Sequence, residues 1–496
     1  MLRLQYYIKI PTFEKKFMNI KNIFAAFAAL LCAIQANADS PEKGQGYILA
    51  IYAADLHGRT VAELNKDYPM IPASTMKTVT TGLALEELGA DFRFETSLAY
   101  SGTIDSLGTL HGDLYIVGGA DPTLGTTRVK RDSVFGIWHE AVKAAGIDSI
   151  AGNVIGDDRL FPDEIASSAW EWGDLGTYYG AGASGLSFHE NSISLRIIPA
   201  DTPGEKPSIE QMYPLTPWME MKNLATTGQR RSANSIYLYT SEVSPVSELR
   251  GSYPSDGGIN VEECCNKYPA MTCAYDFDRY LASKGINSLY GAIDTRRFAT
   301  RPQSGFNNRD SLEYIVTTFS APLSYIVSRT NKESNNMYAE TLFKMTGLSY
   351  CGSATYEASR KTASAILKKL GIDTEGYRQI DGSGLSRQNL VSPEFLCRFL
   401  AAIAKRTYGK TFIESLPSPG KEGTLKYFLR DIPADAASRV KAKSGSMSGV
   451  RCYAGYIVGN SPDDTIVFAI MSNGNTGKGT HVQKHLEKII MGLLEQ

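Results

Sequence analysis

A serine and a lysine three residues apart are the first pair in this chain that could carry out covalent chemistry. Ser74 and Lys77 lie at the start of a helix predicted over residues 75–88, with Gly89 as its stop. One helical turn separates their side chains, so the lysine amine can reach the serine hydroxyl. A desolvated lysine is a base that activates a serine nucleophile, and the N–H groups of a helix start stabilise an oxyanion.

The pair alone has a structural alternative. Ser74 could act only as the N-cap of the helix. The spacing Ser-x-x-Lys also recurs at residues 40–43, 418–421 and 438–441, so chance supplies it freely. Further motifs are therefore needed before the pair is interpreted as catalytic.

A second motif begins at Ser334, where another helix is predicted to start. Its hydroxyl could relay a proton, and the carboxamide of Asn336 could orient a substrate amide. The alternative is again a helix cap, because residues 232–234 also fit Ser-x-Asn.

The third motif is Lys443-Ser444-Gly445, the one Lys-[Ser/Thr]-Gly in the chain, on a predicted strand. A lysine and a hydroxyl can hold a carboxylate, and Gly445 would allow a substrate backbone to approach closely. The N–H of Ser446 could complete an oxyanion hole. The alternative is a solvent-facing edge strand, on which lysine is common.

Composition excludes several other classes of function. Of 496 residues, 43% are hydrophobic and 21% charged, and the net charge is −1. These values indicate a globular protein of more than one domain and give no support for nucleic-acid binding. No Gly-x-Ser-x-Gly elbow, His-Glu-x-x-His or Cys-x-x-Cys is present, so neither a histidine triad nor a metal site is predicted, and no cofactor.

The amino end predicts export. A basic segment, an apolar run over residues 23–34 and Ala36-Asn37-Ala38 form a signal peptide over residues 1–38. No other stretch is long enough to cross a bilayer, so the mature chain is predicted to lack a transmembrane span and to be periplasmic or otherwise extracytoplasmic. Export permits disulfides, and Cys273 could bridge to Cys264 or Cys265, whereas the other cysteines lie in apolar segments typical of buried thiols.

Strand and helix patterns place the three motifs in one interrupted domain. Two strands (46–54 and 61–71) lead into the Ser74 helix; helices are predicted over 311–329, 335–347, 353–371 and 393–406; strands over 438–446, 451–459 and 465–472 precede a closing helix over 482–494. Between them lies a long stretch rich in short strands and glycine turns. We therefore expect a signal peptide (1–38), a discontinuous domain (44–95 and 300–496) and an inserted region (96–299) that forms one or two, and more plausibly two, mainly β domains.

The order of the three motifs is similar to the signature of penicillin-binding proteins and serine β-lactamases. Further stretches narrow the resemblance: residues 112–124, 152–158, 381–387, 416–425 and 454–456. They span nearly the whole mature chain, which resembles the D-alanyl-D-alanine carboxypeptidase/endopeptidases of peptidase family S13, the class C low-molecular-mass penicillin-binding proteins. This family inserts extra domains between the first and second motifs.

The resemblance implies an α/β (α+β) transpeptidase-like fold, an antiparallel sheet flanked by helices, with a large mainly β insertion. It also implies roles for individual residues. Ser74 would be acylated, Lys77 would take its proton, Ser334 would pass a proton to the leaving D-alanine, and Asn336 would bind the substrate amide.

Further roles follow from the same resemblance. Lys443 and Ser444 would hold the terminal carboxylate, and the amides of Ser74 and Ser446 would form the oxyanion hole. Arg387, with Asp157 or Asp158, would contact the diamino acid of the stem peptide. Two departures from the family pattern are Ser444 for the usual threonine, and Met447-Ser448 where leucine and often glutamine follow.

The predicted function is a serine-type D-Ala-D-Ala carboxypeptidase, with endopeptidase action as an open possibility, whose partners are peptidoglycan stem peptides and β-lactams. A β-lactamase is disfavoured by the insertion, and a synthetic transpeptidase by the lack of a membrane span. A protein that only binds the cell wall or senses penicillin is disfavoured by the complete set of catalytic groups.

Overall fold

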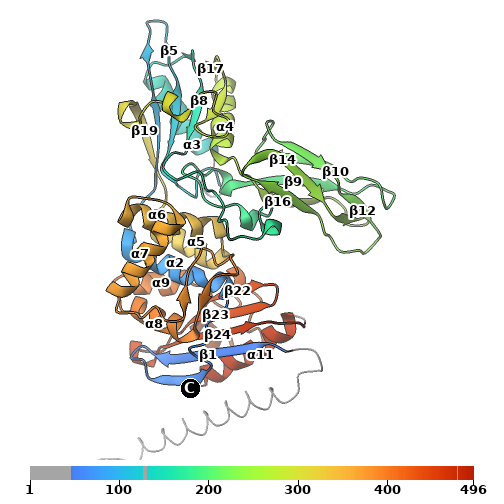
Figure 1. Ribbon diagram of the computed structural model, residues 1–496, viewed down its shortest axis with the longest axis vertical. Helices are drawn as coiled ribbons and strands as arrows, with labels where there is room; N and C mark the ends of the chain where they lie inside the picture. The colour runs from blue at the N-terminus through green and yellow to red at the C-terminus, as the bar shows by residue number, and fades with distance from the viewer. Residues whose placement is uncertain (1–45, 127–130, 478, 496) are drawn as a thin grey trace, which may run out of the picture.

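The computed structural model describes residues 46–126, 131–477 and 479–495. The predicted signal peptide (1–38) lies outside these residues. Figure 1 shows a helix-and-sheet body at the bottom and two smaller units above it, one rising over the body and one projecting to the side. The first and last described strands lie together in the body, and the middle of the chain forms the upper units.

The body is organised around a five-stranded antiparallel sheet in the order β2-β1-β24-β23-β22. Its strands come from both ends of the chain: β1 (Ile48–Asp55), β2 (Thr60–Leu64), β22 (Val440–Met447), β23 (Val450–Ile457) and β24 (Ile466–Asn473). The edge strand β22 carries the Lys443 motif. The predicted strand 61–71 ends earlier, at Leu64, because the chain turns away from the sheet before it reaches Ser74.

Alternating side chains of this sheet build two hydrophobic cores. In β1, Ala50 and Tyr52 face the main helical layer, whereas Ile51 and Ala53 face α11 (Gly479–Leu494). Successive side chains of a strand point to opposite faces, so both faces of β1 are apolar and both are covered. The helical layer comprises α2 (Met76–Leu88), α5 (Leu323–Glu333), α6 (Asn336–Cys351), α7 (Tyr356–Lys369), α8 (Pro393–Ala404) and α9 (Gly409–Ser415). A short α10 (Ala434–Arg439) leads into β22.

Helix α2 lies inside the helical layer. Its first ten residues are all buried, including the polar side chains of Lys77, Thr78, Thr80 and Thr81, so its first turns are enclosed by protein. It contacts α6 most extensively, and α5, α7 and α8 as well. The start of α2 is thus held in a fixed place between the sheet and α6.

The upper unit nearest the body is a mixed sheet with two helices. Its central sheet has the order β18-β8-β6-β3-β19. The elements are β3 (Glu95–Tyr100), β6 (Leu114–Gly118), β8 (Val154–Asp157), β18 (Ala292–Asp294) and β19 (Glu313–Phe319), with α3 (Arg131–Ala144) and α4 (Pro269–Ser283). A second sheet, β17-β7-β5-β4, joins β4 (Thr103–Ile104), β5 (Thr109–His111), β7 (Ser149–Ile150) and β17 (Asn287–Ser288).

The unit that projects to the side is built of short strands. Sheet β10-β9-β16 combines β9 (Ser192–Ile198), β10 (Ser208–Tyr213) and β16 (Asn260–Cys265). Sheet β11-β14-β13 combines β11 (Glu220–Asn223), β13 (Tyr237–Ser241) and β14 (Ser244–Arg250), and β12 (Thr226–Gly228) pairs with β15 (Ser252–Pro254). In the body, β20 (Tyr377–Arg378) pairs with β21 (Leu390–Val391) across the loop that bears Arg387.

Several elements differ from the sequence prediction, among them the short helices α9 and α10, which were not predicted. Helices α3 and α4 were not predicted, because the whole stretch was interpreted as short strands and glycine turns. The helix predicted over 311–329 is wrong in its first half, where Glu313–Phe319 forms β19 and pairs antiparallel with β3. Its run of Ile315, Val316, Thr317 and Thr318 has the β-branched side chains that favour a strand.

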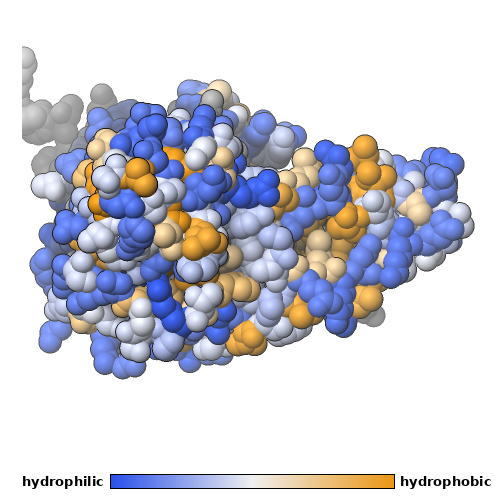
Figure 2. All heavy atoms as spheres, turned by 90° about the horizontal axis from the view of Figure 1, so that it is seen from above, coloured by the Kyte–Doolittle hydropathy of each residue, from blue (hydrophilic) through white to orange (hydrophobic). Residues whose placement is uncertain are grey.

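The cysteines of the described residues are all free thiols. Five of them are buried, and Cys351, which was expected to be buried, is exposed. Within the described residues no helix is long and apolar enough to span a membrane, and no group of histidine, cysteine and carboxylate side chains could hold a metal. Seen from above, hydrophilic side chains predominate on the surface, with apolar ones scattered among them (Figure 2).

Candidate active site

Ser74 lies in a tight turn at the start of α2. The 3-10 turn Ala73–Thr75 leads directly into the helix, and Ala73 has a left-handed φ of 46°. Such a conformation is uncommon for a residue other than glycine and is retained only where the surroundings enforce it. Here the loop at Gly384 presses against the turn, since a Cβ on that residue would lie 2.0 Å from the carbonyl oxygen of Ala73.

Lys77 is fully buried beneath Ser74, and its Nζ makes three hydrogen bonds. It donates to Ser74 Oγ at 3.0 Å, to Asn336 Oδ1 at 2.6 Å and to the carbonyl oxygen of Ser383 at 2.8 Å. Burial lowers the pKa of Lys77 from 10.5 to about 7, although the nearby carboxylates of Glu340 and Asp381 oppose that shift. A large part of this lysine is therefore a neutral amine near neutral pH, as a general base requires.

The second motif joins two helices at the cavity. Ser334 ends α5 in a left-handed conformation with φ 60°, and Asn335 caps α6 by accepting a hydrogen bond from the N–H of Tyr338 at 3.0 Å. Asn336 is buried, and its Nδ2 donates to the carbonyl oxygen of Tyr179 at 2.8 Å. Its amide is thereby oriented with the oxygen toward Lys77. Ser334 ends α5 and Asn335 caps α6, but capping does not explain why Asn336 contacts Lys77.

The third motif lies on β22 against the serine turn. β22 is an edge strand, but Lys443 on it is fully buried, so the alternative of a solvent-facing lysine is wrong. Burial, reinforced by the charge of Lys77, lowers the pKa of Lys443 well below its ordinary value. Its Nζ donates to the carbonyl oxygen of Ser444 at 2.8 Å, and Ser444 Oγ donates to Thr424 Oγ1 at 2.8 Å.

The structure gives a reason for a glycine at position 445 that differs from the expected approach of a substrate backbone. A Cβ at this position would lie 2.5 Å from the carbonyl oxygen of Pro72 and 3.1 Å from the amide nitrogen of Ser74. The glycine thus lets β22 pack directly against the backbone of the serine turn. The lack of a side chain at Gly445 is therefore needed for a contact within the protein, between β22 and the serine turn.

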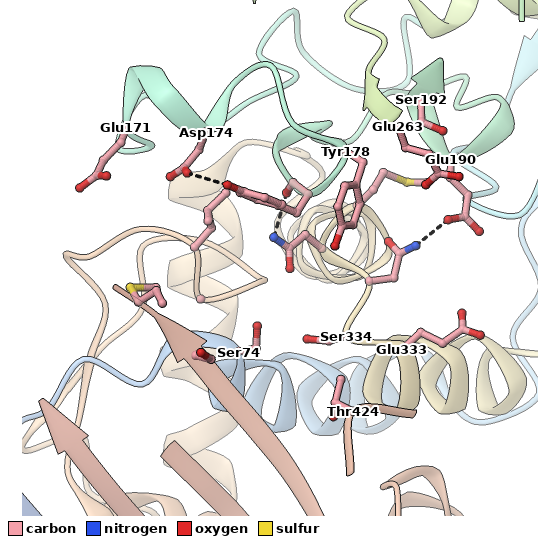
Figure 3. A pocket seen from close by; sticks show the side chains of 18 of the residues that line it. Ser74, Glu171, Asp174, Tyr178, Glu190, Ser192, Glu263, Glu333, Ser334 and Thr424 are labelled. Atoms are coloured by element: carbon pink, nitrogen blue, oxygen red, sulfur yellow. Dashed lines mark hydrogen bonds between the residues drawn. The ribbon is translucent and has the colours of Figure 1, made fainter. Parts of the chain in front are cut away.

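A cavity of about 710 Å³ opens above these motifs. Ser74, Ser334 and Asn336 line it from the body, together with Thr424 from the loop before α10 and Ser446 from β22 (Figure 3). The inserted region supplies the opposite wall, which includes Tyr178 and Tyr179. Lys77, Lys443 and Ser444 are not among the lining residues: both lysines are fully buried, and Ser444 is half-buried.

Arg387 lines the cavity, as expected, but Asp157 and Asp158 do not. Asp157 is fully buried between Arg159 at 2.7 Å and Arg309 at 3.0 Å, and although burial opposes ionisation these arginines hold its pKa at about 2. Asp158 is paired with Arg296 at 3.0 Å. The structure therefore does not bring either aspartate to the cavity, and arginines already pair with both carboxylates.

The acidic residues that do face the cavity were missed by the sequence interpretation. Arg387 Nε pairs with Glu171 at 2.9 Å, and Asp174 lies beside it; Glu190 and Glu263 lie at the other end (Figure 3). Burial raises the pKa of Asp174, and the charge of Glu171 adds to this effect. Glu171 and Asp174 lie at a short 3-10 turn (Trp172–Asp174), Glu190 lies in another (His189–Asn191), and Glu263 lies within β16; isolated acids at such places look like solvated surface. Their spacing in the sequence matches no motif that would have identified them as cavity residues.

Known proteins match both the sequence and the fold. A model of the D-Ala-D-Ala carboxypeptidase 3 (S13) family matches residues 32–496. The D-alanyl-D-alanine carboxypeptidase of Actinomadura sp. (strain R39) is 30% identical over 419 residues, covering 82% of this chain and 74% of that protein. Penicillin binding protein 4 (dacB) of Haemophilus influenzae has a crystal structure with a TM-score of 0.79 at 23% identity, covering 93% and 99% of the two chains. The same protein complexed with a β-lactam has a TM-score of 0.73 at 22% identity, covering 94% and 98%.

Together, the flanked antiparallel sheet and the serine–lysine pair at the start of its buried helix define a serine peptidase with a penicillin-binding protein fold. The chain belongs to the D-Ala-D-Ala carboxypeptidase 3 (S13) family. The predicted fold is confirmed, and so is the predicted function of a serine-type D-Ala-D-Ala carboxypeptidase.

Proposed function

We propose that Ser74 is the nucleophile of this carboxypeptidase and Lys77 its general base. The observation that carries the proposal is the set of hydrogen bonds at Lys77 Nζ. A neutral lysine has two N–H bonds and one lone pair. When Asn336 Oδ1 and the Ser383 carbonyl accept the two N–H bonds, the lone pair is directed at the Ser74 hydroxyl.

The reaction then runs through an acyl-enzyme. Lys77 takes the Ser74 proton as the serine oxygen attacks the carbonyl carbon between the two D-alanines, and the amides of Ser74 and Ser446 receive the oxyanion. When the C–N bond breaks, Ser334 gives its proton to the leaving D-alanine nitrogen and takes the proton held by Lys77, so the lysine is again a neutral base. A water molecule, deprotonated by the same base, hydrolyses the ester and restores Ser74.

The terminal carboxylate of the substrate is bound at the Lys443 end of the cleft. Lys443 is buried beside β22, and a pair of hydroxyls, Ser444 and Thr424, are hydrogen-bonded to each other at 2.8 Å. An incoming carboxylate would favour the protonated form of Lys443 and accept hydrogen bonds from the hydroxyls. Asn336 retains its role in binding the substrate amide next to the serine.

The diamino acid of the stem peptide is read by Arg387 and its acidic neighbours. Glu171 and Asp174 can pair with an ammonium group, and Arg387 with a carboxylate, so this part of the cavity fits a side chain that carries both charges. We propose Glu171 and Asp174 for the role first given to Asp157 and Asp158.

β-Lactams are bound covalently at Ser74, and cross-linked peptides are substrates as well as pentapeptides. The cavity volume of about 710 Å³ supports the second statement, because a branched peptide needs more room than a linear one. Peptidoglycan lies outside the cytoplasmic membrane, so this function requires export, and the predicted signal peptide over residues 1–38 supports it.

Digestion of purified peptidoglycan by the mature protein tests this function. Mass spectrometry should detect free D-alanine and tetrapeptides from pentapeptides, and monomers from cross-linked dimers. Release of D-alanine alone would remove the endopeptidase part of the proposal. Rapid hydrolysis of penicillin with no change in the peptidoglycan would replace it with a β-lactamase. Binding without any cleavage or acylation would indicate a wall-binding or penicillin-sensing protein.

A further inference from the structure

A buried carboxylate next to the catalytic groups has no role in the steps above. Glu340 lies on α6, four residues after Asn336 and so on the same face of the helix, and it is fully buried. Its Oε2 accepts a hydrogen bond from the N–H of Gly382 at 3.0 Å, and its Oε1 accepts one from the N–H of Ser383 at 2.7 Å.

These two N–H groups belong to the loop that supplies one of the acceptors for Lys77. The carbonyl oxygen of Ser383 accepts from Lys77 Nζ at 2.8 Å. The N–H of the same peptide unit, that of Gly384, donates to Asp381 Oδ1 at 2.8 Å. Glu340 therefore fixes the backbone on one side of Ser383 and Asp381 fixes it on the other.

The direction of this carbonyl determines where the base points. Asn336 and Ser383 accept the two N–H bonds of the neutral amine and leave its lone pair toward Ser74. If the Ser383 carbonyl could rotate away, one N–H of Lys77 would turn toward the serine and the lone pair would be misdirected. Asn336 reaches the amine directly from α6, and Glu340 reaches it through the loop.

We propose that Glu340 is a positioning residue that holds the Ser383 carbonyl on Lys77 and thereby aims the base at Ser74. This inference rests on the proposed roles of Ser74 and Lys77. Glu340 does not contact the cavity and is not a catalytic residue; it acts through the backbone of residues 382–383.

The charged groups around Glu340 allow a second test of the proposal, which is the pKa of Lys77. Lys77 faces it from α2, Asp381 from the loop, Lys344 from α6 and Tyr356 from α7. Burial, reinforced by Asp381, raises the pKa of Glu340 to about 7. When ionised, Glu340 in turn raises the pKa of Lys77 against the effect of burial. Removal of this charge should therefore lower the pKa of the base.

Two variants of Glu340 distinguish the effect of its side-chain length from the effect of its negative charge. Glu340→Gln keeps the size of the side chain but loses the charge and one of the two acceptors. Glu340→Asp keeps the charge but withdraws it by one methylene group from the two N–H groups. Glu357→Gln on α7 is the matched control, since Glu357 is 69% exposed and pairs only with Lys361 at 2.7 Å.

The measurement is the rate constant of acylation by a fluorescent penicillin from about pH 5 to 9, expressed per folded protein from circular dichroism and melting curves. We expect both Glu340 variants to lose more than about fivefold in the plateau rate, because general-base catalysis depends on alignment. We expect the acidic limb of the profile to move to lower pH in Glu340→Gln alone. The control should match the wild type in both respects.

Plateau rates within about fivefold of the wild type would overturn the proposal, and so would an unmoved acidic limb in Glu340→Gln. If Glu340→Gln does not fold, the rate of Glu340→Asp decides; if neither folds, Glu340 is a structural residue and the proposal is rejected. A wild-type protein that is not acylated at Ser74 would instead refute the proposed function itself.

Discussion

Lys77 acquires the properties of a base from its neighbours. It lies on a helix whose first ten residues are buried, and its Nζ has oxygen partners on α6 and on the loop before Arg387. Burial favours the neutral amine, while Glu340 and Asp381 keep its pKa from falling further. The resulting value of about 7 places the base in the pH range in which a general base is most effective.

The pH dependence of acylation follows from this pKa. Because the neutral amine is the active form, the rate should rise about tenfold per pH unit below the pKa of Lys77 and level off above it. We expect the bend at about pH 7. Stopped-flow acylation across this range measures it, with Lys77→Ala as the control that has no such limb. A rate that keeps rising to the pH of an ordinary lysine would show that Lys77 is not the base.

Substitutions of Lys443 test whether this lysine recognises the substrate carboxylate. Lys443→Ala should lower kcat/KM on a D-Ala-D-Ala peptide by about tenfold to a hundredfold, since a charge-assisted hydrogen bond in a desolvated cleft contributes about 1.5–3 kcal/mol. Lys443→Arg should restore part of this loss.

The control is the same peptide with an amidated C-terminus. Wild type should lose rate on the amide, and Lys443→Ala should discriminate much less between the two peptides. Equal discrimination by both proteins would mean that Lys443 does not read the carboxylate.

At the scale of elements, the site depends on how closely β22 approaches the turn before α2. Gly445 allows this contact, since its position leaves no room for a Cβ beside the Pro72 carbonyl. Both partners are backbone, and a side chain could not rotate out of the way. The contact sets the distance between the amides of Ser74 and Ser446.

Gly445→Ala should therefore separate β22 from the serine turn. We expect a loss of acylation of about tenfold or more, because the oxyanion donors move apart, and a lower melting temperature. Gly46→Ala is the control, because nothing lies within 4 Å of a Cβ at that position. A Gly445→Ala protein that is acylated as fast as the wild type would refute the importance of this contact.

Local patterns predicted the elements that carry the motifs, and missed those whose identity depends on pairing. The helix after Ser74 has apolar residues three to four positions apart and a glycine stop, and the strand around Lys443 alternates at Val440 and Ala442; both elements are present. Strand β19 was mistaken for a helix because its partner, β3, lies more than two hundred residues earlier in the chain. The same limit explains Asp157: its ion pair with Arg159 is local, but the sequence gives no sign that Arg309, 152 residues later, encloses the carboxylate as well.

On the scale of the whole molecule, the inserted region holds the catalytic groups as well as forming one wall of the cavity. Tyr179 supplies the carbonyl that orients Asn336, and Glu190 Oε2 accepts a hydrogen bond from Asn335 at 2.8 Å. The indole Nε1 of Trp170 donates to Asp381 Oδ2 at 2.8 Å. These contacts could not be predicted, because they join the insertion to the body across about 150 to 210 intervening residues.

The boundaries of the insertion remain a prediction. We propose that it ends near Ser320 and not at residue 299, because β19 is hydrogen-bonded along its length to β3 at the start of the insertion. The domain of the catalytic motifs then comprises the first two strands with α2, and the chain from α5 onward.

Trp170 tests the connection between the insertion and the body. Trp170→Phe removes the hydrogen bond to Asp381 and should lower the free energy of unfolding by about 1–3 kcal/mol, with a slower acylation rate because the loop at Ser383 is less fixed. Trp172→Phe is a matched control, since Trp172 is 60% exposed and its replacement should change stability by less than about 0.5 kcal/mol. Urea unfolding measures both. Equal stability of the two variants would show that the contact does not couple the two regions.

The most direct test of the central claim is the identification of the acylated residue. The mature protein is treated with a fluorescent penicillin, digested and sequenced by mass spectrometry, in parallel with Ser74→Ala and with Ser40→Ala as a control. We expect one adduct, on Ser74, that is absent from Ser74→Ala and unchanged in the control. An adduct on any other residue, or undiminished labelling of Ser74→Ala, would contradict the assignment of Ser74 as the nucleophile.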